Sequence, residues 1–431
     1  MKCRVCLVLV MIVSLVLTMS WRGVAKQREF KIYMAPEHVF ATYEEVFKEF
    51  EKTYGYKVRV EKAAWSEMRP KILADFVAGT PPDLLESRPG WTIEFGLLGF
   101  LTDLTERISQ WPDSQDWFES ALKEPSYKGR FYGVKIHATC TALFYNRSLF
   151  RKAGLDVDNP PKTWKEMLEV AKTLTQDLDG DGSPDQYGYG MDPILGAPAG
   201  VFVGWLGASG TSYFNESGTL VNLDTPEAIE LGRFLQRLKK WSYVAEPAGP
   251  VTAVRRLFAS KRNIGMIITG PWDISNFLEI APDLDYSVDH IPVPEGNPWG
   301  SSGHGTHITI PKGTKTADDA WELVKMLTAT EVEVETTKQF GMTFPRNSWA
   351  EDPAIQKMPL IGKFGSLIGY ATPYFGLQVS KLGVPKAAGK IGRTLLMELY
   401  ERIVYLEEDP AVAFKDFTQK ANRLIEEERG L

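Results

Sequence analysis

The sequence YGVKIHATCTALFYNRSLFRKAGL, residues 132–155, is the most informative segment of the chain. It begins with an alternating apolar run, residues 132–136, which is typical of a half-buried strand. Small and polar residues follow at 137–141 and are too irregular for a core strand. A second apolar run leads into a helix that is expected to stop at Gly154. The segment is either a β-turn-β-α unit of one large domain or a crossing between two domains.

The same segment resembles the first interdomain crossing of a known family, the bacterial extracellular solute-binding proteins that serve sugar ABC transporters, of the maltose-binding-protein-like kind. In that family a YGVP-like strand, a polar crossing, a second strand and a helix follow in this order. The matching motifs here are YGV at 132–134, LFYNR at 143–147 and LFRKAGLD at 149–156. Lys135 departs from the pattern, because the family usually has proline there. The resemblance favours a crossing between two domains.

Other motifs extend the resemblance from residue 30 to about residue 350. GTPPD at 79–83 is fairly specific in its context, and FASKRNIGMIITGPW at 258–272 is the second strong match. AWELVKML at 320–327 is close to a family helix. SSGHG at 301–305 resembles the family's glycine pair before a return strand, and FPR at 344–346 resembles its third crossing. Most of the chain is therefore covered.

The amino-terminal part of the chain alternates strands with helices. Strands are expected at 30–34 and 57–61, helices at 42–54 and after Ser66, and a third strand at 84–85. Short connections between such elements predict a parallel sheet covered by helices. Ligands bind beyond the carboxyl ends of strands in sheets of this kind. Four polar residues fall there: Glu37, His38, Glu86 and Ser87.

The expected fold class is α/β, with two lobes of mixed or parallel sheet flanked by helices. The resemblance implies the type II periplasmic-binding-protein fold with a multi-strand hinge. Three crossings would divide the chain discontinuously. Residues 26–137 with 303–343 would form the amino-terminal lobe, and residues 138–302 with 344–431 the carboxyl-terminal lobe. A length of 431 residues also favours more than one domain.

Residues 1–25 have the composition of a secretory signal peptide. Lys2 and Arg4 precede an apolar run at 5–19, and small residues follow at 23–25. The apolar run is short for a membrane span, although an uncleaved anchor is the alternative. The expected location is therefore secreted, in the periplasm or on the outer face of the cytoplasmic membrane. No lipobox-like motif is present, so a lipoprotein is not predicted.

Cleavage of that peptide would leave an acidic protein. The 49 basic residues would fall to 46 while the 55 acidic residues remain, giving a net charge of −9. Such a surface argues against nucleic acid or an anionic membrane as the partner. Cys140 would be the only cysteine left, which excludes an intrachain disulfide.

Aromatic side chains on loops facing a crevice suit a sugar, because indole rings stack on the apolar faces of pyranoses. Trp272 is the leading candidate, since the resemblance implies that the Gly-Pro-Trp turn presents this ring to the ligand. Ordinary core packing is the alternative for any tryptophan, and is favoured for Trp65. The other predicted ligand contacts rest on topology and are Glu37, His38, Glu86, Ser87, His137, Thr139, Trp205, His304, Arg346 and Tyr374.

One acidic loop has the spacing of a calcium site. Asp177, Asp179, Asp181 and Asp185, with Gly182 at the sixth position, match the start of an EF-hand loop. The twelfth position is glycine, so the bidentate glutamate is missing. The loop is either a structural Ca²⁺ site or a tight acidic turn, and no other cofactor is predicted.

The sequence is therefore interpreted as a secreted, non-catalytic carbohydrate-binding protein. No nucleophile elbow or phosphate loop is present, and the five histidines do not favour a catalytic metal. The resemblance implies an ABC transporter permease as partner, and a monomer is expected. The alternatives are a secreted glycoside-cleaving enzyme, or the same fold binding a peptide or a polyamine.

Overall fold

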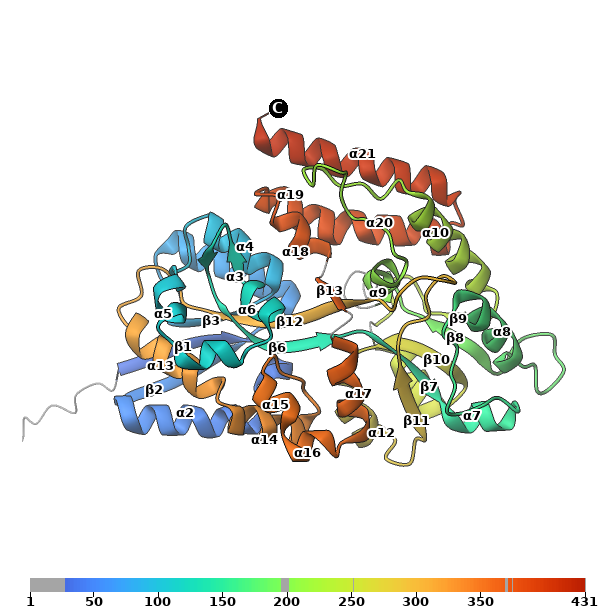
Figure 1. The fold of residues 1–431 in the computed structure, drawn as a ribbon, viewed down its shortest axis with the longest axis horizontal. Helices are drawn as coiled ribbons and strands as arrows, with labels where there is room; N and C mark the ends of the chain where they lie inside the picture. Colours follow the sequence, from blue (N-terminus) through green and yellow to red (C-terminus); the bar gives the residue numbers. More distant parts are fainter. Residues whose placement is uncertain (1–27, 195–200, 251, 369–370, 374, 431) are drawn as a thin grey trace, which may run out of the picture.

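The computed structural model describes residues 28–194, 201–250, 252–368, 371–373 and 375–430. The expected signal peptide and Tyr374 lie outside the described residues. Figure 1 shows two bodies, one on the left and one on the right, each containing strands and helices. Strands β6 and β12 run between them. The expected α/β class is confirmed.

The first sheet lies mostly in the left-hand body and mixes parallel and antiparallel pairs. Strand β1 pairs in parallel with β2 and β3, while β12 pairs antiparallel with β3 and β6 and parallel with β13. The carboxyl ends of β1 and β3 therefore point the same way, as predicted. The strands are β1 (Arg28–Met34), β2 (Tyr56–Lys62), β3 (Leu84–Ser87), β6 (Val134–Cys140), β12 (Ser301–Thr309) and β13 (Ala371–Pro373).

The second sheet lies in the right-hand body. Its strand order is β11-β7-β10-β8-β9, with β7 antiparallel to β10 and β11, and β8 parallel to β9 and β10. The strands are β7 (Ala142–Asn146), β8 (Tyr187–Met191), β9 (Ser242–Val244), β10 (Ile264–Thr269) and β11 (Tyr286–Asp289). A separate hairpin pairs β4 (Ser126–Tyr127) with β5 (Arg130–Phe131).

The connection between the two sheets is more regular than the sequence suggested. The expectation that residues 137–141 are too irregular for a core strand is wrong for 137–140, because β6 extends to Cys140 and all of its residues are buried. Pairing with β12 supplies the hydrogen-bonding partners. Gly305 of β12 has φ +146°, and a Cβ there would lie 2.0 Å from the His137 carbonyl oxygen. Only glycine permits this approach.

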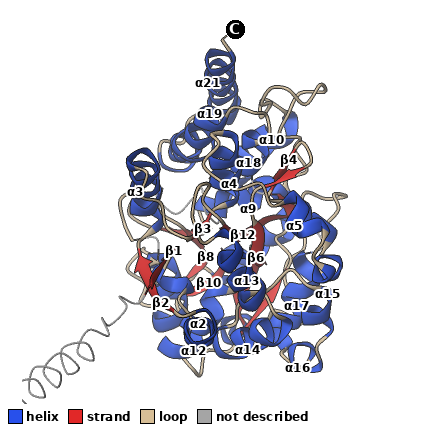
Figure 2. Ribbon diagram, turned by 90° about the vertical axis from the view of Figure 1, so that its left-hand side faces the viewer, coloured by secondary structure: helices blue, strands red, loops and turns tan. Residues whose placement is uncertain are grey.

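Helices cover both sides of the first sheet (Figures 1 and 2). Helix α2 ends at Gly55, whose φ of +72° is the usual left-handed cap. Helix α3 begins at Trp65 after Ala64, so the prediction that this helix starts after Ser66 is wrong. The helices are α2 (Ala41–Tyr54), α3 (Trp65–Ala78), α4 (Pro89–Leu97), α5 (Thr105–Ser109), α6 (Glu119–Lys123), α13 (Ala317–Leu327), α14 (Thr330–Phe340), α15 (Asn347–Glu351) and α16 (Pro353–Gln356).

The helices of the right-hand body begin with α7, directly after β7. Thr163 and Glu166 form the predicted capping box of α8. These helices are α7 (Arg147–Lys152), α8 (Trp164–Leu174), α9 (Val201–Ala208), α10 (Pro226–Lys239), α11 (Ala253–Arg256), α12 (Trp272–Ile280) and α17 (Pro359–Ile368).

The carboxyl-terminal helices pack on both bodies. They share a core with α8 and α10, while α18 and α19 also contact α4 of the left-hand body. Gly90 of α4 permits this contact, because a Cβ there would lie 3.3 Å from the Ser380 hydroxyl. The helices are α18 (Phe375–Ser380), α19 (Pro385–Gly389), α20 (Leu396–Tyr400) and α21 (Pro410–Arg429), with π-helical turns at 390–395 and 401–405.

The two bodies have separate apolar cores. Trp205 lies in the core formed by β7, β8 and β10, and Trp321 in the core of the first sheet. Residues 344–361 contribute Phe344, Trp349 and Ile361 to the core of the first sheet. The lobe boundaries given above stay a prediction. Within the described residues, the structure contains no helix with the length and apolarity needed to span a membrane.

Candidate ligand-binding site

The carboxyl ends of β1 and β3 bring an acid and a histidine together. Glu86 is the third residue of β3, and His38 ends the 3₁₀ turn η1 (Pro36–His38) that follows β1. Nδ1 of His38 lies 2.5 Å from Oε1 of Glu86, while Oε2 accepts the Ala35 backbone N–H at 3.0 Å. Glu86 is completely buried, so its charge depends on these two partners.

The pKa values of this pair move apart. Burial opposes the charge of His38, but the Glu86 carboxylate outweighs burial and raises the pKa of the imidazole. Burial likewise opposes the charge of Glu86, but His38 outweighs it and lowers the pKa of the carboxyl. The pair is therefore ionic under mildly acidic conditions.

A second histidine adjoins the pair. The rings of His137 and His38 are 4.6 Å apart, and Nδ1 and Nε2 of His137 contact the hydroxyls of Thr306 at 2.9 Å and Tyr43 at 3.1 Å. Burial and the charge of His38 lower the pKa of His137 to about 3, so this ring is neutral. His38, Glu86 and His137 offer ligand atoms within 4.8 Å of one another. Both nitrogens of His137 are already engaged, so the group is a hydrogen-bonded cluster rather than an open metal site.

An aromatic and charged surface lies beside this cluster. The rings of Trp65 and Trp91 are 5.7 Å apart, and the Arg88 guanidinium lies 4.8 Å above the Trp65 ring. Nε1 of Trp65 donates a hydrogen bond to Glu37 at 2.7 Å, and His38 packs edge-on against the same ring at 6.0 Å. Trp65, Arg88 and Trp91 are all partly exposed. We call Glu37, His38, Trp65, Arg88 and Trp91 the aromatic group.

Sequence reasoning found only part of the aromatic group. Arg88 and Trp91 were not predicted, and core packing was favoured for Trp65. The signal was present, because Arg88 follows the end of β3 directly and Trp91 lies in the first turn of α4. The rule that selected Glu86 and Ser87 therefore extends to the start of the next helix.

On the other body, Trp272 occupies the predicted strand-to-helix turn between β10 and α12. Its ring packs over Gly270, where a Cβ would lie 2.2 Å from a ring carbon. The next residue, Asp273, pairs with Arg255 at 3.2 Å, and Asp192 lies 3.9 Å from the same guanidinium. Burial raises the pKa of Asp192 to about 6. The GPW turn thus adjoins a buried charged cluster.

The remaining predicted contacts are scattered. Trp205 is completely buried and its Nε1 donates to the Tyr189 hydroxyl at 3.3 Å, so its ring packs within the core. Arg346 is buried and donates to Asp116 at 2.7 Å and to the Thr328 carbonyl at 2.6 Å. The Ser87 hydroxyl is buried and donates to the Arg88 carbonyl. His304 pairs with Thr139 in the register of β12 and β6, and Tyr374 lies outside the described residues.

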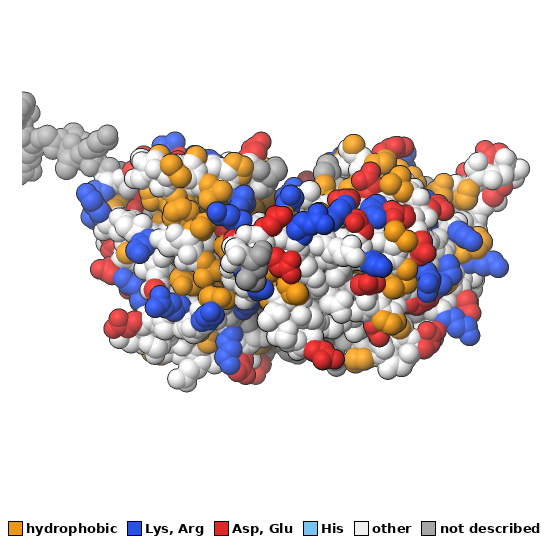
Figure 3. Space-filling view, turned by 90° about the horizontal axis from the view of Figure 1, so that it is seen from above, with side chains coloured by type: hydrophobic (Ala, Val, Ile, Leu, Met, Phe, Trp, Pro, Cys, Tyr) orange, Lys and Arg blue, Asp and Glu red, His pale blue; other side chains and the backbone are white. Residues whose placement is uncertain are grey.

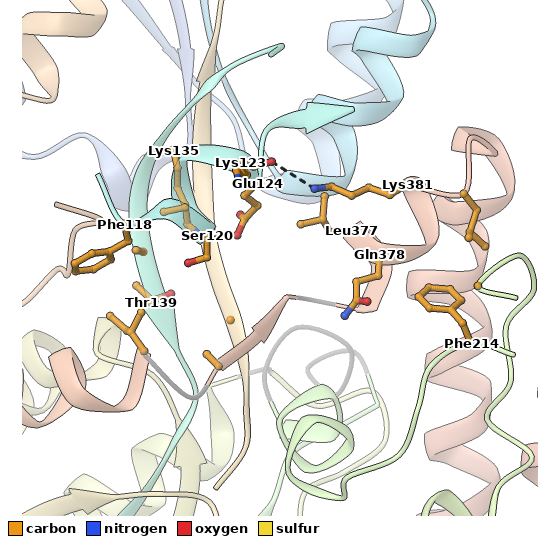
Figure 4. A pocket seen from close by; sticks show the side chains of 17 residues that line it. Phe118, Ser120, Lys123, Glu124, Lys135, Thr139, Phe214, Leu377, Gln378 and Lys381 are labelled. Carbon is orange, nitrogen blue, oxygen red and sulfur yellow. Dashed lines mark hydrogen bonds and ion pairs between the residues drawn. The ribbon is translucent and has the colours of Figure 1, made fainter. Parts of the chain in front are cut away.

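A pocket of about 460 Å³ opens between α6, β6 and β12 on one side and α18 with the loop around residue 214 on the other (Figure 4). Thr139 lines it, together with Phe118, Phe214 and Gln378. No member of the aromatic group lines this pocket.

The acidic loop gathers three of its four aspartates. Ligand oxygens of Asp177, Asp179 and Asp185 lie within 4.8 Å of one another, and all three residues are exposed. Asp177 accepts the backbone N–H groups of Gly180 and Gly182, at 2.7 and 2.9 Å. Asp181 accepts the Ser183 N–H at 2.7 Å. The carboxylates thus support a tight turn, and calcium binding stays a prediction.

Two α/β bodies joined by crossing strands, with polar and aromatic residues at the carboxyl ends of one sheet, define a type II periplasmic binding protein. Comparison with known families agrees. The family model described as bacterial extracellular solute-binding protein matches residues 35–334. The chain belongs to this family.

Individual relatives and structures are consistent with that assignment. A binding protein of Brucella abortus (strain 2308) is 27% identical, over 69% of this chain and 71% of that protein. The maltotriose-binding protein of Pyrococcus abyssi is also 27% identical, over 68% of this chain and 61% of its own length. The GacH receptor of Streptomyces glaucescens superposes with a TM-score of 0.79 at 20% identity, covering 93% of this chain and 99% of GacH. The expected fold and family are confirmed, and these relatives are binding proteins rather than enzymes.

Proposed function

We propose that the protein captures an oligosaccharide between its two bodies and delivers it to the permease of an ABC transporter. The observation that carries the proposal is the pair of partly exposed tryptophans, Trp65 and Trp91, at the carboxyl end of the first sheet. Indole faces stack on the apolar C–H faces of sugar rings. Arg88 and Glu37, which flank the rings, supply donors and acceptors for hydroxyls.

Trp272 on the other body provides the opposing surface. Only a closed arrangement lets one sugar touch both surfaces, so binding shifts the population toward closure. The maltotriose-binding relative supports an oligosaccharide as the ligand class. Family membership supports a secreted or periplasmic location and a permease partner, and we include a monomeric state in the proposal. No catalytic step is proposed.

The test is a titration of the purified full chain with neutral trisaccharides, beginning with maltotriose and mannotriose. Binding is monitored by tryptophan fluorescence and by the shift in melting temperature. At least one should raise the melting temperature. Trp91→Ala should lower the affinity for that sugar by about tenfold or more, because stacking and burial of the indole ring are lost. Trp241→Ala is the matched control, since this partly buried indole packs against the opposite core, near Lys172.

The proposal fails if no neutral oligosaccharide stabilises the protein. It also fails if Trp91→Ala and Trp241→Ala bind the active sugar equally well. Release of smaller sugars from the incubated trisaccharide would instead favour a glycoside-cleaving enzyme.

A further inference from the structure

The pocket in Figure 4 differs from the aromatic group in its charge. Four charged residues line it, the lysines Lys123, Lys135 and Lys381 and the single acid Glu124. The chain as a whole carries a net charge of −6. Figure 3 shows acidic and basic side chains mingled over the face that it displays. A pocket with three lysines and one acid is therefore a local exception.

The carboxylate of Glu124 is paired with two neighbouring side chains. Nζ of Lys135 lies 2.5 Å from Oε2 of Glu124, and Nε2 of His307 lies 3.0 Å from Oε1. Burial opposes its charge, yet Lys135 and His307 together lower the pKa of Glu124 to about 2. Burial lowers the pKa of His307, which leaves that ring neutral. The charges of Lys135 and Glu124 thus cancel.

Lys123 pairs with the exposed carboxylate of Glu119 at 2.5 Å, which leaves Lys381 on the α18 side of the pocket. Its ammonium donates to the Lys123 carbonyl oxygen at 3.5 Å, and Figure 4 shows it directed across the pocket toward Lys123 and Glu124. Among the residues that the structure describes, no carboxylate lies within 4.0 Å of this ammonium. Much of the lysine chain is exposed, but burial of its charged end lowers the pKa of Lys381. The Glu124 carboxylate acts in the opposite direction, while Lys135 adds repulsion. An anion in the pocket would offset both the burial and the repulsion.

The rest of the lining suits a hydroxylated ring. Phe118, Phe214 and Leu377 provide apolar surface, while Ser120, Thr139 and Gln378 carry hydrogen-bonding groups. A volume of about 460 Å³ is within the usual range for small-molecule sites. We propose that this pocket binds a saccharide that carries a carboxylate, with the acid group held by Lys381. The proposal rests on the proposed function only for the sugar-like body of the ligand.

The test uses two sugars that differ at one carbon. D-galacturonate carries a carboxylate where D-galactose carries a hydroxymethyl group, so any preference reports on charge. Galacturonate should bind the full chain about tenfold or more tightly, as expected for a charge-assisted hydrogen bond. Lys381→Met should abolish this preference, and added salt should reduce it. Lys52→Met is the control, because Lys52 is an exposed lysine of α2 outside the pocket.

Each outcome decides the proposal. Equal binding of the two sugars, or a Lys381→Met variant that keeps the preference, overturns it. Inorganic phosphate that displaces galacturonate with similar affinity would show a general anion site and overturns the saccharide class. The Trp91→Ala variant separates this inference from the proposed function. If it loses neutral trisaccharide binding but keeps the preference for galacturonate, the result supports both the proposed function and this inference. Trisaccharide binding without any galacturonate preference defeats only the inference.

Discussion

Nδ1 of His38, a member of the aromatic group, lies 2.5 Å from Oε1 of Glu86, although 48 residues separate them in the chain. The parallel pairing of β1 with β3 creates this contact, because it aligns the ends of both strands. The imidazole also packs against Trp65 and His137. The ion pair therefore supports the position of the proposed sugar-stacking surface.

Glu86→Gln should lower the free energy of unfolding, most strongly between pH 4.5 and 6.5. The folded pKa of His38 is raised above 6.5, so its contribution is present below that pH and disappears as pH rises through the higher folded value. The folded pKa of Glu86 is lowered below 4.5, so its contribution is present above that pH and disappears as pH falls through the lower value. Denaturant unfolding between pH 4.5 and 6.5 should show that Glu86→Gln has a free energy of unfolding about 2 kcal/mol lower than the wild type.

The control for this change is Glu45→Gln, which removes an exposed pair with Lys48 on α2. Exposed pairs contribute little, so its effect should stay well below that of Glu86→Gln. Equal losses at all pH values for Glu86→Gln would contradict an ionic His38–Glu86 pair.

Glu333→Gln should raise stability at neutral pH. Glu333 is completely buried, and neither carboxylate oxygen has a hydrogen-bond partner among the described residues. Burial raises its pKa well above the usual value of 4.5, although Arg346 acts in the opposite direction. The folded state therefore keeps the proton while the unfolded state loses it above pH 4.5, and stability falls as pH rises. Glutamine mimics the protonated acid and removes this loss.

The measurement is melting temperature against pH for Glu333→Gln and for Glu335→Gln, an exposed position on the same helix. The advantage of Glu333→Gln over the wild type should grow as pH rises above 4.5 and vanish below it. Parallel curves for all three proteins would show that Glu333 is ionised in the folded state.

Sequence reasoning located the first sheet well because strand alternation, helix stops at Gly55 and Gly79, and the parallel-sheet rule are local signals. It placed Trp205 among the ligand contacts and favoured core packing for Trp65, because the sequence does not show which helical tryptophan is enclosed. Only the packing shows that Trp205 is enclosed beside Tyr189 while Trp65 remains partly exposed. Non-local contacts, such as Arg346 with Asp116 across 230 residues, have no sequence signal in a single chain.

Calcium should raise the melting temperature if the acidic loop is a metal site. The three close carboxylates supply oxygen ligands of the kind that Ca²⁺ prefers. Asp179→Asn should remove the effect, and a chelator should reverse it in the wild type. Asp318→Asn, an exposed aspartate on α13, is the control. Identical melting curves with calcium and with chelator would identify the loop as an acidic turn.

Trp272→Ala should lower the affinity for the oligosaccharide that binds the wild type by about tenfold or more. Trp272→Phe should have a smaller effect, because it keeps an aromatic face. The ring lies at the start of α12, after the last residues of β10. Isothermal titration with the sugar found for the wild type is the measurement. Unchanged affinity in Trp272→Ala would remove this indole from the binding surface.

Gly270→Ala tests the same ring without deleting it. A Cβ at residue 270 would lie 2.2 Å from a carbon of the Trp272 indole, well inside van der Waals contact, so the ring must move. Because stacking requires a fixed ring position, the variant should lose sugar affinity even though every aromatic residue is retained. Gly362→Ala is the matched control, since its nearest atom would be 3.8 Å away. Full affinity in Gly270→Ala would mean that the ring position seen here is not the one that contacts sugar.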